Sequence, residues 1–89
     1  MSSSLQNNVI EATVEKYSYK SIPGLYVTFI HPKKLVKCEG FVSVHKLKLS
    51  KNAKDEFMTG NCPNYLSVEK KIKVSIIVED GCWADLELV

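Results

Sequence analysis

Carboxylates that could act as an acid and base pair in catalysis are poorly placed in this sequence. The two adjacent acidic pairs, Asp55-Glu56 and Glu79-Asp80, project their side chains in diverging directions, so neither pair converges on one point. No serine, histidine and aspartate arrangement can be inferred from the spacing, and no glycine-rich phosphate loop occurs. We therefore expect a protein that is not an enzyme and that uses no cofactor.

The cysteines and histidines do not form a metal-binding pattern. Cys38, Cys62 and Cys82 are odd in number and widely spaced, with no pair separated by two residues. His31 precedes a proline in a loop and His45 stands alone, so neither has a partner histidine. We expect no metal site, and free thiols in a reducing, intracellular compartment, either cytoplasm or nucleus.

The length and charge fit one small globular domain. The chain has 89 residues and a net charge of +2. We expect a disordered lead-in at residues 1–8 and a single domain at residues 9–89. No apolar run is long enough to span a membrane. All twelve basic residues are lysine, which binds polyanions loosely and with strong salt dependence, although coding bias explains such a composition equally well.

Alternating hydrophobicity predicts three strands in the first half of the chain. The first begins at Val9, and Ser21–Gly24 interrupts it with turn residues. The second runs over Leu25–Ile30 and the third over Phe41–Lys46, with a bulge or strand end near Lys46. Between them, Leu35–Cys38 forms either a short strand or the edge of a loop.

The second half predicts a helix followed by a hairpin. Ser50 is placed to cap a short helix over Lys51–Met58, and Thr59–Tyr65 has a loop composition. Asp80-Gly81 supplies turn residues between two alternating runs. Their apolar positions are Ile72, Val74, Ile76 and Val78 before the turn, then Ala84, Leu86 and Leu88 after it. The pattern indicates a small antiparallel sheet or barrel.

The order of these segments resembles the S1 RNA-binding domain, a family within the OB-fold. The residues that carry the resemblance are Ile10–Lys16, Gly24–Phe29, Gly40–Leu47, Leu66–Val74, Val78–Asp80 and Leu86–Leu88. The resemblance implies an all-β, five-stranded antiparallel OB-fold barrel with a short helix between strands three and four. It also implies a non-catalytic module that binds RNA or single-stranded nucleic acid, as part of a larger protein or complex.

An OB-fold barrel binds single strands by stacking bases on exposed aromatic rings while lysines follow the phosphates. The resemblance implies this activity, and the alternation along the strands then selects the binding face and its flanking lysines. These residues are Tyr26, Thr28, Phe41, Ser43 and His45 on the face, with Lys16, Lys20 and Lys46 beside it. Packing offers an alternative for the two aromatic rings: Tyr26 against a neighbouring strand side chain, and Phe41 beneath Cys38-Glu39.

Departures from the S1 pattern support an alternative function. Ser43 stands where the family has a histidine, Pro23 stands where it has an aromatic residue, and Trp83 replaces a basic residue. Trp83 is a candidate ligand platform, protein-contact anchor or lid over the barrel end. The alternative is an OB-fold domain that binds proteins or adjacent domains and has lost RNA binding, or a small mimic of a translation-factor S1 domain.

Overall fold

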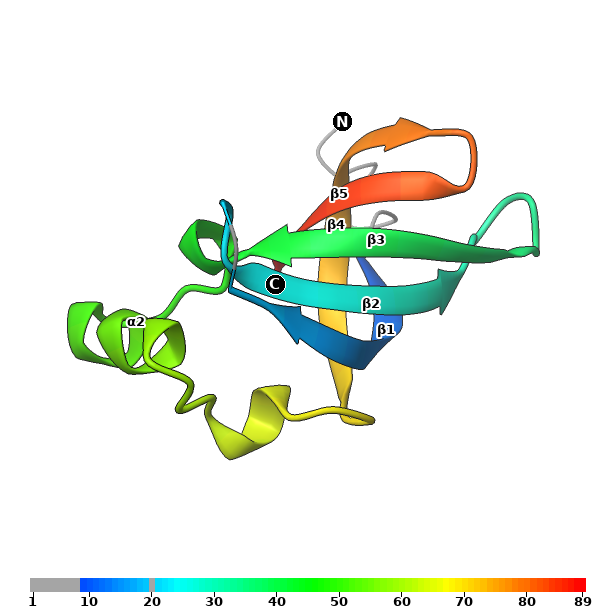
Figure 1. The fold of residues 1–89 in the computed structure, drawn as a ribbon. Coiled ribbons are helices and arrows are strands. Elements are labelled where there is room, and N and C mark those ends of the chain that lie inside the picture. The colour runs from blue at the N-terminus through cyan, green and yellow to red at the C-terminus, as the bar shows by residue number, and fades with distance from the viewer. Residues whose placement is uncertain (1–8, 20) are drawn as a thin grey trace.

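The computed structural model describes residues 9–19 and 21–89, in which five strands close into a barrel (Figure 1). The expected lead-in at residues 1–8 and the candidate Lys20 lie outside the described residues. The elements in chain order are β1 (Val9–Ser18), β2 (Gly24–Ile30), β3 (Lys37–Ser43), the 3-10 turn η1 (Val44–Lys46), α2 (Lys51–Met58), the 3-10 turn η2 (Asn64–Leu66), β4 (Lys71–Asp80) and β5 (Trp83–Leu88). The described chain is therefore mostly β, with one short α-helix between the third and fourth strands, as the sequence predicts.

The strand directions differ from the expected antiparallel barrel. The order around the barrel is β1-β2-β3-β5-β4, and β4 pairs back with β1. Four pairs are antiparallel, whereas β3 and β5 run parallel with Glu39 opposite Trp83. Directions around a closed ring alternate throughout only when the number of strands is even. Five strands must therefore leave at least one parallel pair, and the prediction of a purely antiparallel barrel is wrong.

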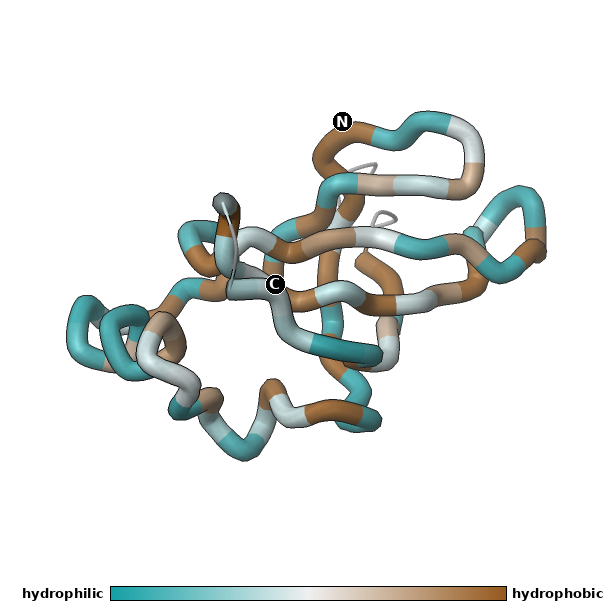
Figure 2. The backbone as a smooth tube through the Cα atoms, in the orientation of Figure 1, coloured by the Kyte–Doolittle hydropathy of each residue, from teal (hydrophilic) through white to brown (hydrophobic). Residues whose placement is uncertain are grey.

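Inward-facing residues of all five strands form one hydrophobic core. Successive side chains of a strand point to opposite faces, so every second residue reaches the interior. Hydrophobic and hydrophilic positions accordingly alternate along much of the barrel backbone (Figure 2). The strand residues of the core are Ala12, Val14, Leu25, Val27, Phe29, Cys38, Val42, Ile72, Val74, Ala84 and Leu86. The segment between β3 and β4 completes the core with Val44, Leu47, Phe57 and Leu66.

Helix α2 lies at one end of the barrel, opposite the β2–β3 loop and the β4–β5 turn (Figure 1). The helix begins where predicted, because the Ser50 hydroxyl accepts a hydrogen bond of 3.2 Å from the Ala53 N–H. Phe57 is its only buried residue. Its ring lies 6.1 Å from Tyr17 and 5.6 Å from Tyr19, measured between ring centroids. This aromatic cluster attaches an otherwise polar helix to the barrel.

The third strand lies earlier in the chain than the sequence predicts. It spans Lys37–Ser43, and residues 44–46 form η1 instead of extending it. The Ser43 hydroxyl accepts a hydrogen bond of 3.2 Å from the His45 N–H, which stabilises the turn. Val44 remains buried in the core, and its N–H donates to the Pro23 carbonyl at 2.8 Å. Val44 is buried two residues after the buried Val42, so the sequence alternates like a strand although residues 44–46 form a turn. The prediction of a strand through Lys46 is therefore wrong.

A bulge in β4 changes the orientation of its second half. Ile76 is opposite Leu86, but Val78 is opposite Asp85, so Ile77 is an extra residue in the pairing. Val78 is consequently 57% exposed and Ile77 42% exposed. The predicted inward alternation holds through Ile76 and fails at Val78.

Candidate functional site

Three aromatic side chains share the outer face of β2, β3 and β5. Tyr26 is the cross-strand partner of Phe41, and their ring centroids are 5.0 Å apart. Trp83, on β5, lies 6.2 Å from Tyr26 between ring centroids, and the two ring planes are inclined by 56°. These separations are those of interacting aromatic pairs. We call Tyr26, Phe41 and Trp83 the aromatic platform.

A glycine makes room for the platform. A Cβ atom on Gly24 would come within 2.5 Å of Phe41 Cζ and 2.3 Å of the Val42 carbonyl oxygen. The Phe41 ring therefore lies against the backbone of Gly24, and not beneath Cys38-Glu39. This contact explains why the second strand begins with glycine: any side chain there would displace the ring.

Charged residues of both signs surround Tyr26. The Lys16 ammonium lies 5.1 Å from the centroid of the Tyr26 ring, within the range of a cation–π interaction. The Thr28 hydroxyl donates a hydrogen bond of 2.8 Å to Glu15 Oε2. Lys16, Tyr26 and Thr28 share a shallow pocket of about 540 Å³ with Lys37, Glu39 and Trp83. Lysine can attract phosphate to this pocket, whereas the two glutamates oppose it.

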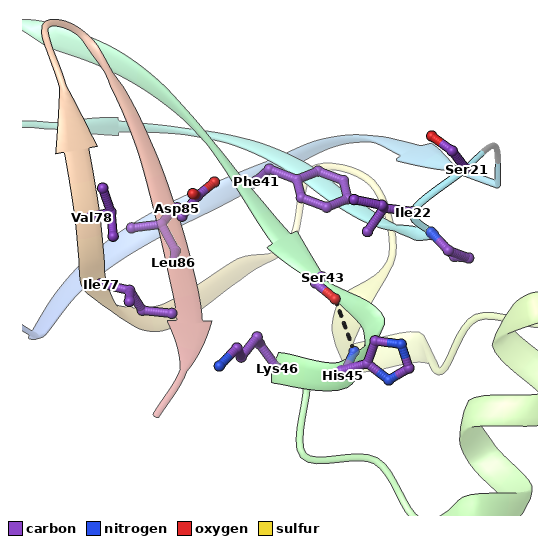
Figure 3. Close-up of a pocket in the computed structure, with 11 residues that line it drawn as sticks. Ser21, Ile22, Phe41, Ser43, His45, Lys46, Ile77, Val78, Asp85 and Leu86 are labelled. Atoms are coloured by element: carbon purple, nitrogen blue, oxygen red, sulfur yellow. Dashed lines mark hydrogen bonds between the residues drawn. The ribbon is translucent and has the colours of Figure 1, made fainter.

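The other side of Phe41 borders a mainly apolar groove of about 460 Å³ (Figure 3). We call it the Phe41 groove. Ile22, Ile77 and Val78 contribute apolar walls, and all three are exposed to solvent. Ile77 and Val78 reach the groove because of the bulge in β4. Polar groups line it as well, from Ser21, Ser43, His45, Lys46 and Asp85.

The candidates from the sequence therefore form two groups that meet at the platform. Lys16, Tyr26 and Thr28 lie together with Trp83. The second group, at the Phe41 groove, consists of Phe41, Ser43, His45 and Lys46. His45 is exposed on the turn η1 and not on a strand, and the Ser43 hydroxyl already accepts its backbone N–H.

Among the lining residues of the Phe41 groove that sequence reasoning missed are Ile22, Ile77, Val78 and Asp85. One signal was available, because Ile76, Ile77 and Val78 are three consecutive apolar residues and a two-residue alternation cannot bury all three. Such a run indicates a bulge or an exposed apolar surface. Ile22 and Asp85 carried no comparable signal, since their positions depend on which strands become neighbours.

Searches of the described residues for a metal site and a membrane-spanning helix, and of the sequence for a matching family or curated protein, found none of these. Residues 9–19 and 21–89 contain no group of three His, Cys, Asp or Glu side chains arranged to hold a metal ion. In the same part of the chain, no helix is long and apolar enough to cross a membrane. No protein-family model matches the sequence, and no curated protein matches it.

Proposed function

We propose that this chain is a non-catalytic module that binds RNA or other single-stranded nucleic acid on the aromatic platform. The observation that carries the proposal is the juxtaposition of three aromatic rings on three adjacent strands, with a lysine ammonium above one of them. Each base stacked on an aromatic side chain contributes about 1–3 kcal/mol to binding. Three rings thus offer enough stacking surface for a short single strand.

The barrel supports the same proposal. Its strand order and its helix between β3 and β4 are consistent with an OB-fold, and we propose an S1-like member of that class. The three cysteines are free, which favours action in a reducing intracellular compartment. The module would work as part of a larger protein or complex.

Lysines around the site predict the salt dependence of binding. Lys16 and Lys37 line the pocket beside Tyr26, and Lys46 lines the Phe41 groove. A single strand that contacts these three lysines would show a log–log salt slope of about −2, at roughly −0.7 per neutralised phosphate. Weak, salt-sensitive binding is therefore expected.

The test is fluorescence anisotropy with a short labelled oligouridine, titrated with the parent and single alanine variants at low salt. Tyr26→Ala and Trp83→Ala should each weaken binding by about 5- to 150-fold, which corresponds to the loss of one stacked base. Tyr65→Ala is the matched control, because Tyr65 is 56% exposed in η2 and lies outside the platform. Circular dichroism checks that each variant folds.

Two results would contradict the proposal. One is equal affinity of the platform variants and Tyr65→Ala. The other is no binding of oligouridine at any salt concentration, which would favour the alternative of a protein-interaction module. That alternative is supported by the net charge of only +2 and by the absence of arginine.

A further inference from the structure

Asp85 is an unexpected residue for a surface that would bind a polyanion. It is the direct cross-strand partner of Phe41 in the parallel β3–β5 pair, so both side chains lie on the outer face of the barrel. Figure 3 shows the Asp85 carboxylate directed toward the Phe41 side of the groove. Asp85 is exposed, and the only salt bridge among residues 9–19 and 21–89 joins His31 and Glu79. The carboxylate is therefore available to a ligand.

The Phe41 groove has the composition of a site for one planar, partly apolar group. Its volume of about 460 Å³ is in the range of small-molecule sites, which combine apolar walls with a few polar groups that fix orientation. Phe41 provides an aromatic ring, and Ile22, Ile77 and Val78 provide aliphatic walls. Lys46 supplies a positive charge in the same groove. A base between these walls would have a cation in reach of its phosphate.

The carboxylate determines which base fits best. An ionised aspartate only accepts hydrogen bonds, so it needs a base edge that presents donors. Guanine presents two adjacent donors, N1–H and the N2 amino group, which match the two oxygens of a carboxylate. Uracil presents a single donor between two carbonyl oxygens, which a carboxylate repels. If an aliphatic protein side chain filled the groove instead, it would cover Asp85 without offering a hydrogen-bond donor, and this costs binding free energy.

We propose that the Phe41 groove binds a guanine base and that Asp85 is the residue that selects it. This inference rests on the proposed function and deepens it, since it assigns base recognition to one side of the platform and sequence-independent stacking to Tyr26 and Trp83. Asp85 lowers affinity for nucleic acid in general by its charge and favours one base by its hydrogen bonds.

Mononucleotides test the groove without requiring a long single strand. The chain is labelled with ¹⁵N and titrated with guanosine, inosine and uridine 5′-monophosphates, while backbone amide shifts are followed by NMR. Guanosine monophosphate should shift the amides of Phe41, Ile77 and Asp85 with an affinity about 5- to 150-fold higher than uridine monophosphate, the discrimination of a bidentate contact. Inosine monophosphate lacks the N2 amino group and should fall between them.

Two variants that each remove one negative charge complete the experiment. Asp85→Asn should remove most of the preference for guanine, because the amide offers only one acceptor oxygen. Asp80→Asn at the end of β4 removes one negative charge outside the groove and should retain the preference. Both residues are exposed, so both variants are expected to fold.

The outcomes separate the inference from the proposed function. Equal affinities for the three nucleotides, or an unchanged preference in Asp85→Asn, would overturn guanine selection even if oligouridine binds to the platform. Absence of shifts at Phe41, Ile77 and Asp85 with every nucleotide would also overturn it and would leave the groove to an apolar protein segment. If the parent chain does not bind oligouridine at any salt concentration, the proposed function itself is overturned.

Discussion

The Nε2 atom of His31 lies 2.8 Å from Oε1 of Glu79 and joins the loop after β2 to the end of β4. His31 is only 4% exposed. The backbone N–H groups of Lys33 and Lys34 both donate to its Nδ1 at 3.1 Å. Because Nδ1 accepts, the proton of the neutral ring is on Nε2, which donates to the carboxylate. This contact attaches the β2–β3 loop to the end of β4, at the end of the barrel opposite α2.

The His31–Glu79 contact predicts a pH dependence of stability. The hydrogen bond from His31 holds the pKa of Glu79 below its ordinary value, with a smaller contribution from the charges of Lys33 and Lys34. A carboxylate with a lowered pKa in the folded state stabilises that state at pH values above its unfolded pKa. This contribution begins to fall as the pH drops toward the ordinary glutamate pKa, and it is lost below the lowered value.

Thermal unfolding of the parent and Glu79→Gln between neutral and acidic pH tests this prediction. Glutamine keeps an acceptor for His31 but does not titrate, so the melting temperatures should differ near neutral pH and converge in acid. Asp80→Asn controls for the loss of one negative charge at the same strand end. A constant difference between parent and Glu79→Gln across the pH range would show that the contact is not linked to pH.

Gly24→Ala should destabilise the barrel by about 1–3 kcal/mol, the usual cost of overpacking. The new methyl group would lie 2.3 Å from the Val42 carbonyl oxygen, and backbone cannot move aside cheaply. Urea unfolding measures the difference in free energy. Gly81→Asn is the control, because a Cβ there meets no atom within 4 Å and asparagine tolerates the positive φ of 63°. Equal stabilities of the two variants would contradict the close packing of Phe41 on Gly24.

Phe57→Ala should be among the most destabilising single changes, at about 3–5 kcal/mol. Phe57 is fully buried and is the only buried residue of α2, so its loss removes the contact of the helix with Tyr17 and Tyr19. Met58→Ala, at a position that is 46% exposed, should change stability by less than roughly 0.5 kcal/mol. Urea unfolding of both variants measures the contrast, and a similar loss in both would mean that α2 is not attached through Phe57.

Removing negative charge beside Tyr26 should strengthen nucleic-acid binding. Glu15 and Glu39 line the same pocket as Lys16 and repel phosphates. Glu15→Gln and Glu39→Gln should each raise affinity for oligouridine by up to about 5-fold at low salt, given the small energies of exposed charge pairs. The gain should disappear at high salt. Glu56→Gln on α2 is the matched control, and a gain of the same size in that variant would point to net charge alone.

The three cysteines should differ in reactivity. Burial raises the pKa of Cys38, with a further contribution from a hydrogen bond to Cys82, and burial also raises the pKa of Cys62. Cys82 is exposed at the β4–β5 turn, whereas Cys38 is 1% exposed. Iodoacetamide should therefore modify Cys82 first and Cys38 last, because the reagent needs an accessible thiolate. Peptide mass spectrometry over a time course gives the order, and early modification of Cys38 would indicate that this end of the barrel opens.

Local patterns predicted much of the architecture. The cap at Ser50 and the helix over Lys51–Met58 occur as expected, because capping and helical spacing act within a few residues. Strand β2 and the turn at Gly81 also agree with their patterns. The pattern was misleading in two places. Val44 is buried as in a strand although it belongs to the turn η1, and the bulge at Ile77 reverses the inward and outward alternation of β4.

The candidate site was predicted less completely than the fold. Alternation along one strand indicates which side chains point outward, and it identified Tyr26 and Phe41. Alternation cannot tell which outward side chains become neighbours. The parallel pairing of β3 with β5 places Trp83 beside Tyr26 and makes Asp85 the partner of Phe41.

The sequence by itself thus determined the number of strands, the helix and their order along the chain, since these follow from periodicity and capping over short stretches. Only the tertiary structure decided the parallel pair, the composition of the aromatic platform and the Phe41 groove. The physical reason is that closing five strands into a ring fixes register and direction between segments about forty residues apart, and no local pattern contains that information.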